Sequence, residues 1–427
     1  MKMNNGPVAL RRLGMLGNHT PRQCGIATFT ADLNHALTSG YPGTDCFVAA
    51  MNDGGKNYAY PTLVRTQIAQ DDLSSYKRAA AFLNGQDLDA LSIQHEYGIY
   101  GGTAGSHLLT LMRDLRMPVV TTLHTVLGEP NEQQWTVMDE VLRRSDRVVV
   151  MSSHGAGLLT KVHGVSPRKI DLIPHGIPSV PLDGRSKDRL GLAGRPVILT
   201  FGLLAPDKGI EYALEAMPAI LKEFPETVYL VVGATHPHVR AEHGETYRLM
   251  LESLVHRLGI GANVHFHNRF VTLDELTEFL AAADLYITPY LNAQQITSGT
   301  LAYAVGSGKA VLSTPYLYAQ ELLAQGRGVL VPYRDPVAIA QEVTGLLADE
   351  PRRLAMSRRA ADLGRSMVWP AVAQSYMASF IRARAEFHTA LPAPSWQNRL
   401  QNSVGLLLDP ARGGAALGGL RSDGKVY

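Results

Sequence analysis

The fold class that the sequence predicts is α/β, in two domains that each contain a parallel sheet covered by helices. The chain has 427 residues, which is more than one hydrophobic core usually supports, so two domains of roughly 200 residues are expected. Short apolar runs alternate with amphipathic helical patterns in both halves. Polar and glycine residues follow the apolar runs, and the carboxyl ends of parallel strands are where such sheets bind ligands.

The first half contains a series of apolar or β-branched runs that predict strands. These strands are expected at 13–17, 46–51, 90–94, 118–123, 147–151 and 170–173, and a helix is expected over about 26–37. The segment 174–195 is rich in Pro and Gly, and it is the best candidate for a linker.

The same alternation restarts after the linker. Strands are predicted at 197–201, 228–232, 264–266, 285–288, 310–313 and 328–331. Helices are predicted at about 210–223, 245–258, 273–282, 300–306, 318–324, 335–348, 350–365 and 369–386. We therefore expect a first domain over 1–190, a second over 191–368, a helix over 369–388 and a flexible tail over 389–427.

Composition excludes several classes of protein. Forty basic and 38 acidic residues give a formal net charge of +2, so no general attraction to nucleic acid is expected. The two cysteines, Cys24 and Cys46, are too few for a disulfide framework, and a reducing cytoplasm is the expected location. Because no run approaches the length of a membrane span or a secretion signal, we expect at most peripheral contact with a membrane.

The segment 197–209, VILTFGLLAPDKG, carries the clearest functional signal. An apolar run ends at Gly202, and Lys208 precedes a helical pattern that starts at 210. The N–H groups at a helix start, the positive end of the helix dipole and the ammonium group of Lys208 would together hold a phosphate. Glycine turns and lysines also open helices that bind no ligand, so the weight of this signal depends on the surrounding motifs.

Further motifs occur in a fixed order along the chain. They are CGIATFTADL at 24–33, QHEYG at 94–98, TLHT at 122–125, VMSS at 150–153, IPHG at 173–176, FGLLAPDKG at 201–209, TPY at 288–290 and SGTLAYAVGSGKAVLSTPYLYAQELL at 298–323. In combination they resemble the retaining nucleotide-sugar glycosyltransferases of the GT-B fold, family 4, over about 12–376. The order of the motifs is specific, although no single motif is.

The resemblance implies two Rossmann-like domains whose parallel sheets face a central cleft. The acceptor would bind mainly to the first domain and the nucleotide sugar mainly to the second, with no cofactor and no metal. The helix from Trp369 resembles the terminal segment that crosses back to the first domain. Gly202, Lys208 and the turn Ser298, Gly299 and Thr300 would bind the donor diphosphate, and Lys208 would stabilise the charge that grows on the leaving phosphate.

The chain departs from the family pattern at several donor positions. Leu203 stands where an arginine usually follows the glycine that aligns with Gly202, so one of two phosphate cations is missing. The family's paired glutamates align on Gln295 and Tyr303. The carboxylate that grips the ribose is therefore absent at Tyr303, and Gln295 offers an amide in the catalytic position beside the sugar.

Two more residues are candidates for donor binding. Arg269, at a strand end in the sequence HNRF, would supply the missing cation; the alternative is an arginine whose stem packs on the surface. Glu321 aligns with a glutamate that follows the family's glycine-rich donor loop, but TPYLYA replaces the usual glycines here.

Candidate residues of the first domain also follow predicted strands. The resemblance places His124 near the donor sugar as a catalytic residue, and the alternative is a buried structural histidine. His95 and Glu96 would bind an acceptor hydroxyl or transfer its proton, but an ordinary loop at a strand end explains them nearly as well. Gly25 would let the acceptor approach the backbone, or it simply opens a helix.

Two other patterns are interpreted without a ligand. The pairs His236/His238 and His265/His267 lack a third ligand at a suitable spacing, so a metal site is rejected. A basic run is interpreted as a solvated helix face, with an anionic membrane surface or an acidic polymer as the alternative. The run consists of Arg352, Arg353, Arg358, Arg359 and Arg365.

We therefore expect a cytoplasmic glycosyltransferase of polysaccharide biosynthesis or other carbohydrate metabolism. It would move a hexose, glucose or mannose, from a UDP-, GDP- or ADP-sugar to a hydroxyl of a saccharide or other polar acceptor, with retention of configuration. Two alternatives stay open. A glycoside phosphorylase of the same fold is favoured by the lost carboxylate at Tyr303, and a non-catalytic nucleotide-sugar-binding protein by the missing arginine and glutamates.

Overall fold

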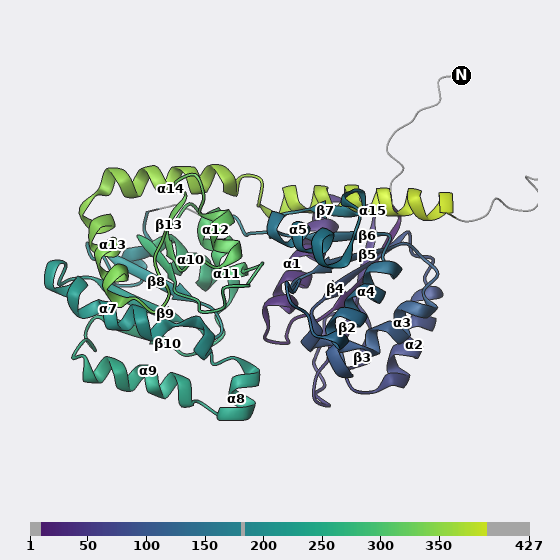
Figure 1. Ribbon diagram of the computed structural model, residues 1–427, viewed down its shortest axis with the longest axis horizontal. Helices are drawn as coiled ribbons and strands as arrows, with labels where there is room; N and C mark the ends of the chain where they lie inside the picture. Colours follow the sequence, from purple (N-terminus) through teal and green to yellow (C-terminus); the bar gives the residue numbers. More distant parts are fainter. Residues whose placement is uncertain (1–9, 181–183, 391–427) are drawn as a thin grey trace, which may run out of the picture. The chain divides into compact units, whose positions relative to one another are not determined.

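The computed structural model describes residues 10–180 and 184–390, and it confirms the α/β class (Figure 1). The first half, residues 10–180, contains a seven-stranded sheet, and the second half, residues 184–368, contains a six-stranded sheet. All strand pairings between the described strands are parallel. The tail predicted over 389–427 falls outside the described residues from 391 onward, so its flexibility stays a prediction.

The first sheet has the strand order β3-β2-β1-β4-β5-β6-β7. Its strands are β1 (Arg12–Gly17), β2 (Asp45–Asn52), β3 (Val64–Ala69), β4 (Ala90–His95), β5 (Val119–Leu123), β6 (Arg147–Val150) and β7 (Ile170–Leu172). The chain builds outward from β1 to β3 and then returns to place β4 on the other side of β1. The loops after β1 and β4 therefore leave a switch point, which is where open parallel sheets bind ligands.

The second sheet repeats this plan with the order β10-β9-β8-β11-β12-β13. Its strands are β8 (Val197–Phe201), β9 (Val228–Val232), β10 (Val264–His267), β11 (Leu285–Thr288), β12 (Ala310–Ser313) and β13 (Gly328–Leu330). The switch point lies between β8 and β11. It brings the loop that carries Gly202 and Lys208 next to the loop that carries Tyr290.

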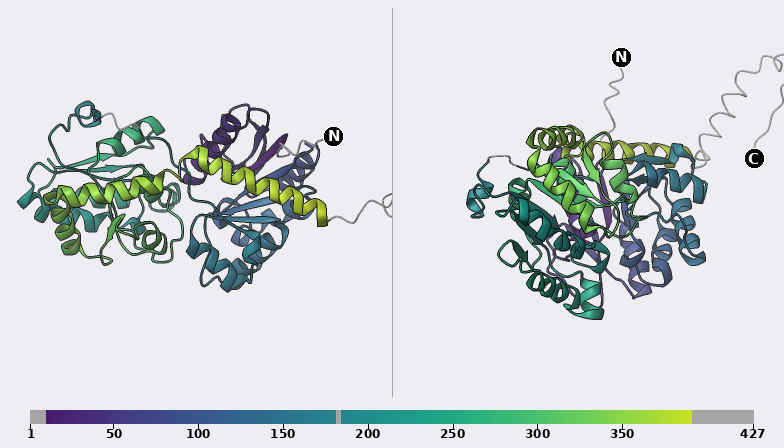
Figure 2. Two further views of the ribbon diagram at one scale, coloured as in Figure 1. Left: turned by 90° about the horizontal axis from the view of Figure 1, so that it is seen from above. Right: turned by 60° about the vertical axis from the view of Figure 1, so that its left-hand side comes forward.

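Helices flank the sheets in both halves (Figures 1 and 2). In the first half they are α1 (Gly25–Gly40), α2 (Leu73–Asn84), α3 (His107–Asp114), α4 (Glu132–Arg144) and α5 (Ser153–His163), with the short 3₁₀ turns η1 (Tyr97–Ile99), η2 (Thr103–Gly105) and η3 (Pro167–Lys169). In the second half they are α6 (Ser186–Arg189), η4 (Pro206–Lys208), α7 (Ile210–Glu223), α8 (Pro237–His243), α9 (Thr246–Arg257), α10 (Leu273–Ala282), α11 (Gly299–Gly306), α12 (Leu317–Leu322), α13 (Pro336–Ala348) and α14 (Glu350–Gly364).

Both faces of each sheet are buried against helices. In β8, Val197 and Leu199 pack into one apolar cluster, and Ile198 packs into another on the opposite face. A strand that is buried on both faces is a nearly continuous apolar run, and this is why most strands were predicted correctly. Strand β3 was not predicted, because VRTQIA has three consecutive polar residues at 65–67 and therefore shows neither an apolar run nor a clear alternation in this partly exposed edge strand.

Helix α15 (Trp369–Ala390) runs along the first half in Figure 2, and side chains from Tyr376 to Arg382 contact that half. The hydroxyls of Tyr376 and Thr122 form a hydrogen bond of 3.0 Å. The carboxylate of Asp171 in β7 accepts hydrogen bonds from Ser379 at 2.7 Å and from Arg382 at 2.8 Å. The segment that follows the second sheet is thus tied to the edge of the first sheet.

Candidate active site

A polar cluster at the switch point of the second sheet joins several predicted donor residues. The hydroxyl of Tyr290, which follows β11, forms a hydrogen bond of 2.9 Å with the hydroxyl of Thr300. Thr300 also contacts the hydroxyl of Ser298 at 3.1 Å. The ammonium nitrogen of Lys208 lies 4.3 Å from the centroid of the Tyr290 ring, a cation–π contact. Tyr290 therefore links the lysine after β8 to the start of α11.

Gly202 completes this cluster by bringing backbone close to it. Its φ angle is +134°, which disfavours any residue with a side chain. A Cβ atom at Gly202 would lie 3.1 Å from the side-chain methyl of Thr300. The glycine thus allows Thr300 to pack closely on this turn, while its own amide donates to the carbonyl of Val232 at 2.9 Å.

Lys208 is positioned by the turn that connects β8 to α7. Pro206, Asp207 and Lys208 form η4, and Gly209 follows in the left-handed conformation with φ +61°. A Cβ atom at Gly209 would lie 2.3 Å from the carbonyl oxygen of Pro289, so this position also requires glycine. The amide of Ile210 at the start of α7 donates to the hydroxyl of Tyr247 at 3.3 Å, so this N–H group already has a partner in the protein.

Lys208 is a cation in this environment. Burial acts to lower its pKa, but Tyr290 and Asp207 outweigh that effect and hold the pKa above the usual value. The ammonium group lies 3.0 Å from the carboxylate of Asp207. A mostly buried charge of this kind is suited to meeting an anionic leaving group.

The turn at 298–300 opens helix α11 as predicted. Ser298 is the N-cap, and its side chain accepts a hydrogen bond from the amide of Leu301. Gly299 packs on the ring of His175, and a Cβ atom there would lie 2.9 Å from its Nε2 atom. Gln295 lies in the preceding loop, where its side-chain amide donates to the backbone carbonyl of Thr297 at 2.9 Å.

A second polar cluster forms where β4 and β5 of the first sheet end. The Nε2 atom of His124 lies 3.0 Å from the side-chain oxygen of Gln94, and the amide of His124 donates to the carbonyl of His95. The ring of Phe29 in α1 packs edge-to-face on the His124 ring. Burial lowers the pKa of His124 to about 3, so its imidazole is neutral near pH 7.

His95 and Glu96 lie next to His124, and their surroundings differ from one another. The His95 side chain is completely buried, and neither ring nitrogen has a hydrogen-bond partner among the described residues. Glu96 caps η1 by accepting from the amide of Tyr97, and it accepts a short hydrogen bond from Thr125. Burial raises the pKa of the Glu96 carboxyl.

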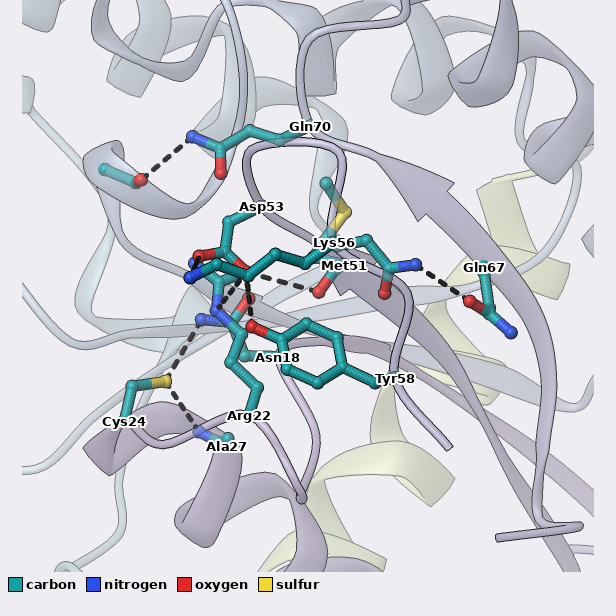
Figure 3. A network of polar contacts seen from close by, with 12 residues as sticks. Asn18, Arg22, Cys24, Ala27, Met51, Asp53, Lys56, Tyr58, Gln67 and Gln70 are labelled. Atoms are coloured by element: carbon teal, nitrogen blue, oxygen red, sulfur yellow. Dashed lines mark hydrogen bonds and ion pairs between the residues drawn. The ribbon is translucent and has the colours of Figure 1, made fainter. Parts of the chain in front are cut away.

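Gly25 opens α1 beside a polar network that sequence reasoning did not single out (Figure 3). A Cβ atom at Gly25 would meet nothing within 4 Å, so this backbone is open. In the network, the guanidinium of Arg22 donates to the side chain of Asn18 at 2.9 Å and lies 3.5 Å from Asp53. Tyr58 donates to the same Asp53 carboxylate at 2.7 Å. The position of Arg22 in the loop between the end of β1 and the start of α1 was the available signal.

Three predicted donor residues make their contacts elsewhere. Arg269 forms a two-pronged ion pair with Glu275 at 2.9 and 2.5 Å. Tyr303 is buried, and its hydroxyl donates to the carboxylate of Asp32 at 3.1 Å. Glu321 contacts the first turn of α5. These contacts give each residue a structural role, and they do not test whether it also binds the donor.

No group of three or more His, Cys, Asp or Glu side chains within 10–180 and 184–390 is placed to hold a metal ion. Among the same residues, no helix combines the length and apolar character that crossing a bilayer requires. Independence from metal stays a prediction.

The fold and this site define the class of the protein as a two-domain GT-B glycosyltransferase. Residues 24–179 match the family model described as Glycosyltransferase Family 4, and residues 195–349 match the model described as Glycosyl transferases group 1. The chain belongs to this glycosyltransferase family, as its motifs predicted. It is accordingly a transferase.

Solved structures of other proteins share the fold. The sucrose-phosphate synthase from Thermosynechococcus elongatus superposes with a TM-score of 0.69 at 18% identity, over 93% of this chain and 100% of that chain. The Anabaena HepE protein in complex with UDP gives a TM-score of 0.67 at 17% identity, over 86% of this chain and 99% of that chain.

Curated relatives are more similar in sequence. A D-inositol 3-phosphate glycosyltransferase of Xylanimonas cellulosilytica is 28% identical over 300 residues, which are 62% of this chain and 67% of that enzyme. Another, of Geodermatophilus obscurus, is 28% identical over 371 residues, 78% of this chain and 75% of that enzyme. A GDP-mannose-dependent alpha-(1-6)-phosphatidylinositol monomannoside mannosyltransferase of Mycolicibacterium smegmatis is 26% identical over 52% of this chain and 58% of that enzyme.

Proposed function

We propose that the chain transfers a hexose from a nucleotide-diphosphate sugar to a hydroxyl of a saccharide or other polyhydroxylated acceptor, with retention of anomeric configuration. The observation that carries this proposal is the cluster of Lys208, Tyr290, Thr300 and Gly202. It combines a partly buried cation, a glycine that packs closely on Thr300 and the N-terminus of α11 at the switch point of the second sheet. These are the elements that stabilise charge on a departing diphosphate.

Each half has its own part in the proposed reaction. The acceptor hydroxyl attacks the anomeric carbon on the face from which the diphosphate departs, and the leaving phosphate oxygen takes the hydroxyl proton. Lys208 stabilises that phosphate. The imidazole of His124 is neutral and contacts Gln94. It is therefore suited to a hydrogen bond with a sugar hydroxyl and not to charge stabilisation as an imidazolium cation. Gln295 is proposed to bind the hexose, and Gly25, His95 and Glu96 the acceptor.

The donor is proposed to be a UDP- or GDP-hexose. Structures of the Anabaena HepE protein contain UDP or UDP-glucose, and the Mycolicibacterium smegmatis relative is GDP-mannose-dependent. Glucose and mannose are therefore the first sugars to test, with ADP-sugars as the third donor class. We further propose that the reaction occurs in the cytoplasm, needs no metal and serves polysaccharide synthesis or related carbohydrate metabolism.

A glycoside phosphorylase is the second candidate, and Tyr303 is the observation that favours it. The carboxylate that binds the ribose in the family pattern is replaced here by a buried tyrosine, whose hydroxyl is hydrogen-bonded to Asp32. An enzyme that uses inorganic phosphate would not need that carboxylate.

The test is a panel of UDP-, GDP- and ADP-glucose and -mannose, each with and without neutral saccharides, inositol and inositol phosphate. Nucleotide release that depends on an acceptor supports the transferase, and proton NMR of the new glycosidic bond then reads its configuration. An inverted product would reject the retaining mechanism. Cleavage of a disaccharide that requires inorganic phosphate, with no nucleotide release from any donor, would identify the phosphorylase instead.

A further inference from the structure

Glu321 forms a contact between the two halves that its sequence motif does not explain. Its carboxylate accepts hydrogen bonds from the backbone amides of Ser153 at 2.8 Å and His154 at 3.3 Å, and lies 3.1 Å from the His154 ring. Glu321 belongs to α12 of the second half, and both amides belong to the first turn of α5 in the first half. We call this contact the Glu321 cap.

The cap satisfies donors that α5 would otherwise leave open. The first N–H groups of a helix have no partner within the helix. The side chain of Ser152 accepts from the amide of Gly155 at 3.1 Å, and Glu321 takes the amides of Ser153 and His154. Burial acts to raise the pKa of Glu321, but these hydrogen bonds outweigh it and keep the pKa below its usual value, so the carboxylate is charged.

An apolar contact accompanies the cap. Ile296, in the loop that follows β11, is 2% exposed and packs in a cluster with Leu123, Val150 and Leu159 of the first half. Gly155 makes room for it, because a Cβ atom there would lie 3.2 Å from the Ile296 side chain. The same turn of α5 thus receives both a carboxylate and an aliphatic side chain from the second half.

The cap is mechanically connected to the proposed donor site. The amide of Tyr318 in α12 donates to the carbonyl of Gln295 at 3.0 Å, and the amide of Leu317 donates to the carbonyl of Ala293 at 3.1 Å. Helix α12 and the loop that carries Gln295 therefore form one backbone-bonded unit. The contact between α12 and the first half therefore fixes the position of Gln295.

We propose that Glu321 is a positioning residue, which docks the Gln295 loop on α5 of the acceptor half when the two halves are closed, and that it is not a ligand of the donor. This inference rests on the proposed function. In this proposal the cap stabilises the arrangement in which the reaction occurs and does not contribute to nucleotide binding. Loss of the cap therefore lowers kcat, while the affinity of the free enzyme for nucleotide is unchanged.

The test removes the contact from each side in turn. Glu321→Gln removes the charge with little change of shape. Ser153→Pro deletes one of the two amide donors from the other half, and α5 tolerates it because proline is favoured at the first helical position and Ser152 is already extended. Ser153→Ala keeps the amide and removes only the hydroxyl, which also hydrogen-bonds Glu321, so the difference between Ser153→Pro and Ser153→Ala isolates the amide. Glu342→Gln, which removes an exposed carboxylate paired with Arg352, is the control outside the cap.

Glu321→Gln and Ser153→Pro are each expected to lower kcat by about 10-fold, the size expected for hydrogen bonds to a charged group. Ser153→Ala should lose less than Ser153→Pro, and Glu342→Gln should match wild type. The double variant should lose no more than about 2- to 3-fold beyond either single variant, because both changes remove one contact. The affinity for UDP and GDP by calorimetry should stay within about 2-fold. A Glu321→Gln variant that loses nucleotide affinity while Ser153→Pro behaves as wild type would overturn the proposal and make Glu321 a donor ligand.

Hydrogen exchange separates failure of this proposal from failure of the proposed function. Exchange of the Ser153 and His154 amides should accelerate in Glu321→Gln and not in Glu342→Gln, and this can be read even if no donor is turned over. Unchanged exchange at these amides in a folded Glu321→Gln protein would refute the cap, whatever the assays of transfer give.

Discussion

The hydroxyl of Tyr303 in α11 donates a hydrogen bond of 3.1 Å to the carboxylate of Asp32 in α1. The two residues are 271 positions apart and belong to different halves of the chain. Tyr303 occupies the position where related enzymes are expected to present a carboxylate to the ribose. In this chain a carboxylate is present next to that position, but it comes from the first half and is bound to the tyrosine.

Asp32 should make stability depend on pH. Burial raises its pKa to about 6, while the polar groups of Tyr303 and Trp369 favour the charged form. Because the folded-state pKa lies above the ordinary value of about 3.9, the stabilising contribution is complete below that value and is lost as pH rises through about 6. Asp32→Asn should therefore gain up to about 3 kcal/mol relative to wild type between pH 4 and pH 7.5, measured by urea unfolding.

Tyr303→Phe provides the matching change on the other side of this contact. It leaves the buried carboxylate with one donor fewer, so it should cost about 1 to 2 kcal/mol at pH 7.5 and less at pH 5, where Asp32 is mostly protonated. Equal losses at both pH values would show that the hydrogen bond to the charged carboxylate is not what Tyr303 contributes.

Three buried histidines should make the protein sensitive to acid. Burial lowers the pKa of His95 and His175 to about 4 and that of His124 to about 3. Between about pH 6.5 and these values the unfolded chain binds protons that the folded chain does not, so stability falls as pH falls. The slope is at most about 1.4 kcal/mol per pH unit for each histidine.

His95→Phe tests this assignment, because it replaces a ring with two unpartnered nitrogens by an apolar ring. Urea unfolding at pH 7.5 and pH 5.5 should show a smaller loss of stability for this variant than for wild type. His256→Gln, at an exposed position, is the control and should keep the wild-type loss. A His95→Phe protein with the wild-type dependence on pH would exclude His95 as a source.

Arg269 should not act as the second phosphate cation. Its guanidinium is held by Glu275, which also accepts from the backbone amide of Thr272 and so caps α10. Arg269→Ala is expected to leave the KM for the nucleotide sugar within about 2-fold of wild type, and Glu275→Gln, which frees the arginine, should do the same. A 10-fold or greater increase in KM in Arg269→Ala alone would restore the arginine to the donor site.

The sequence predicted best what depends on short stretches of chain. Helices α7 and α10 were predicted with the bounds they have, and the cluster of Gly202, Lys208 and Thr300 was predicted because each residue follows a buried strand or opens a helix. The ion pair of Arg269 with Glu275 also depends on a short stretch of chain, although it was not predicted. Thr272 and Glu275 have the spacing of a capping box, which places Glu275 near Arg269.

The contacts that could not be predicted join distant parts of the chain. Tyr303 meets Asp32 and Glu321 meets Ser153 across separations of 271 and 168 residues. Aligning a motif with the family identifies the residue at such a position. The residue that it contacts depends on how the loops of the first sheet pack against those of the second, which the sequence does not show. Tyr290 belongs to the TPY motif of the sequence. Its contacts with Lys208 and Thr300 follow from the pairing of β8 with β11, which the motif alone does not indicate.

The role of Lys208 in stabilising the leaving phosphate is tested by acceptor-dependent nucleotide release by wild type, Lys208→Ala and Lys222→Ala. Lys222 is exposed near the far end of α7 and serves as the control. With the donor that the panel selects, Lys208→Ala should remain folded and lose at least about 100-fold in kcat, because the charge that stabilises the leaving phosphate is gone, and Lys222→Ala should match wild type. A folded Lys208→Ala protein with wild-type turnover would contradict the catalytic role of the cluster formed by Lys208, Tyr290 and Thr300.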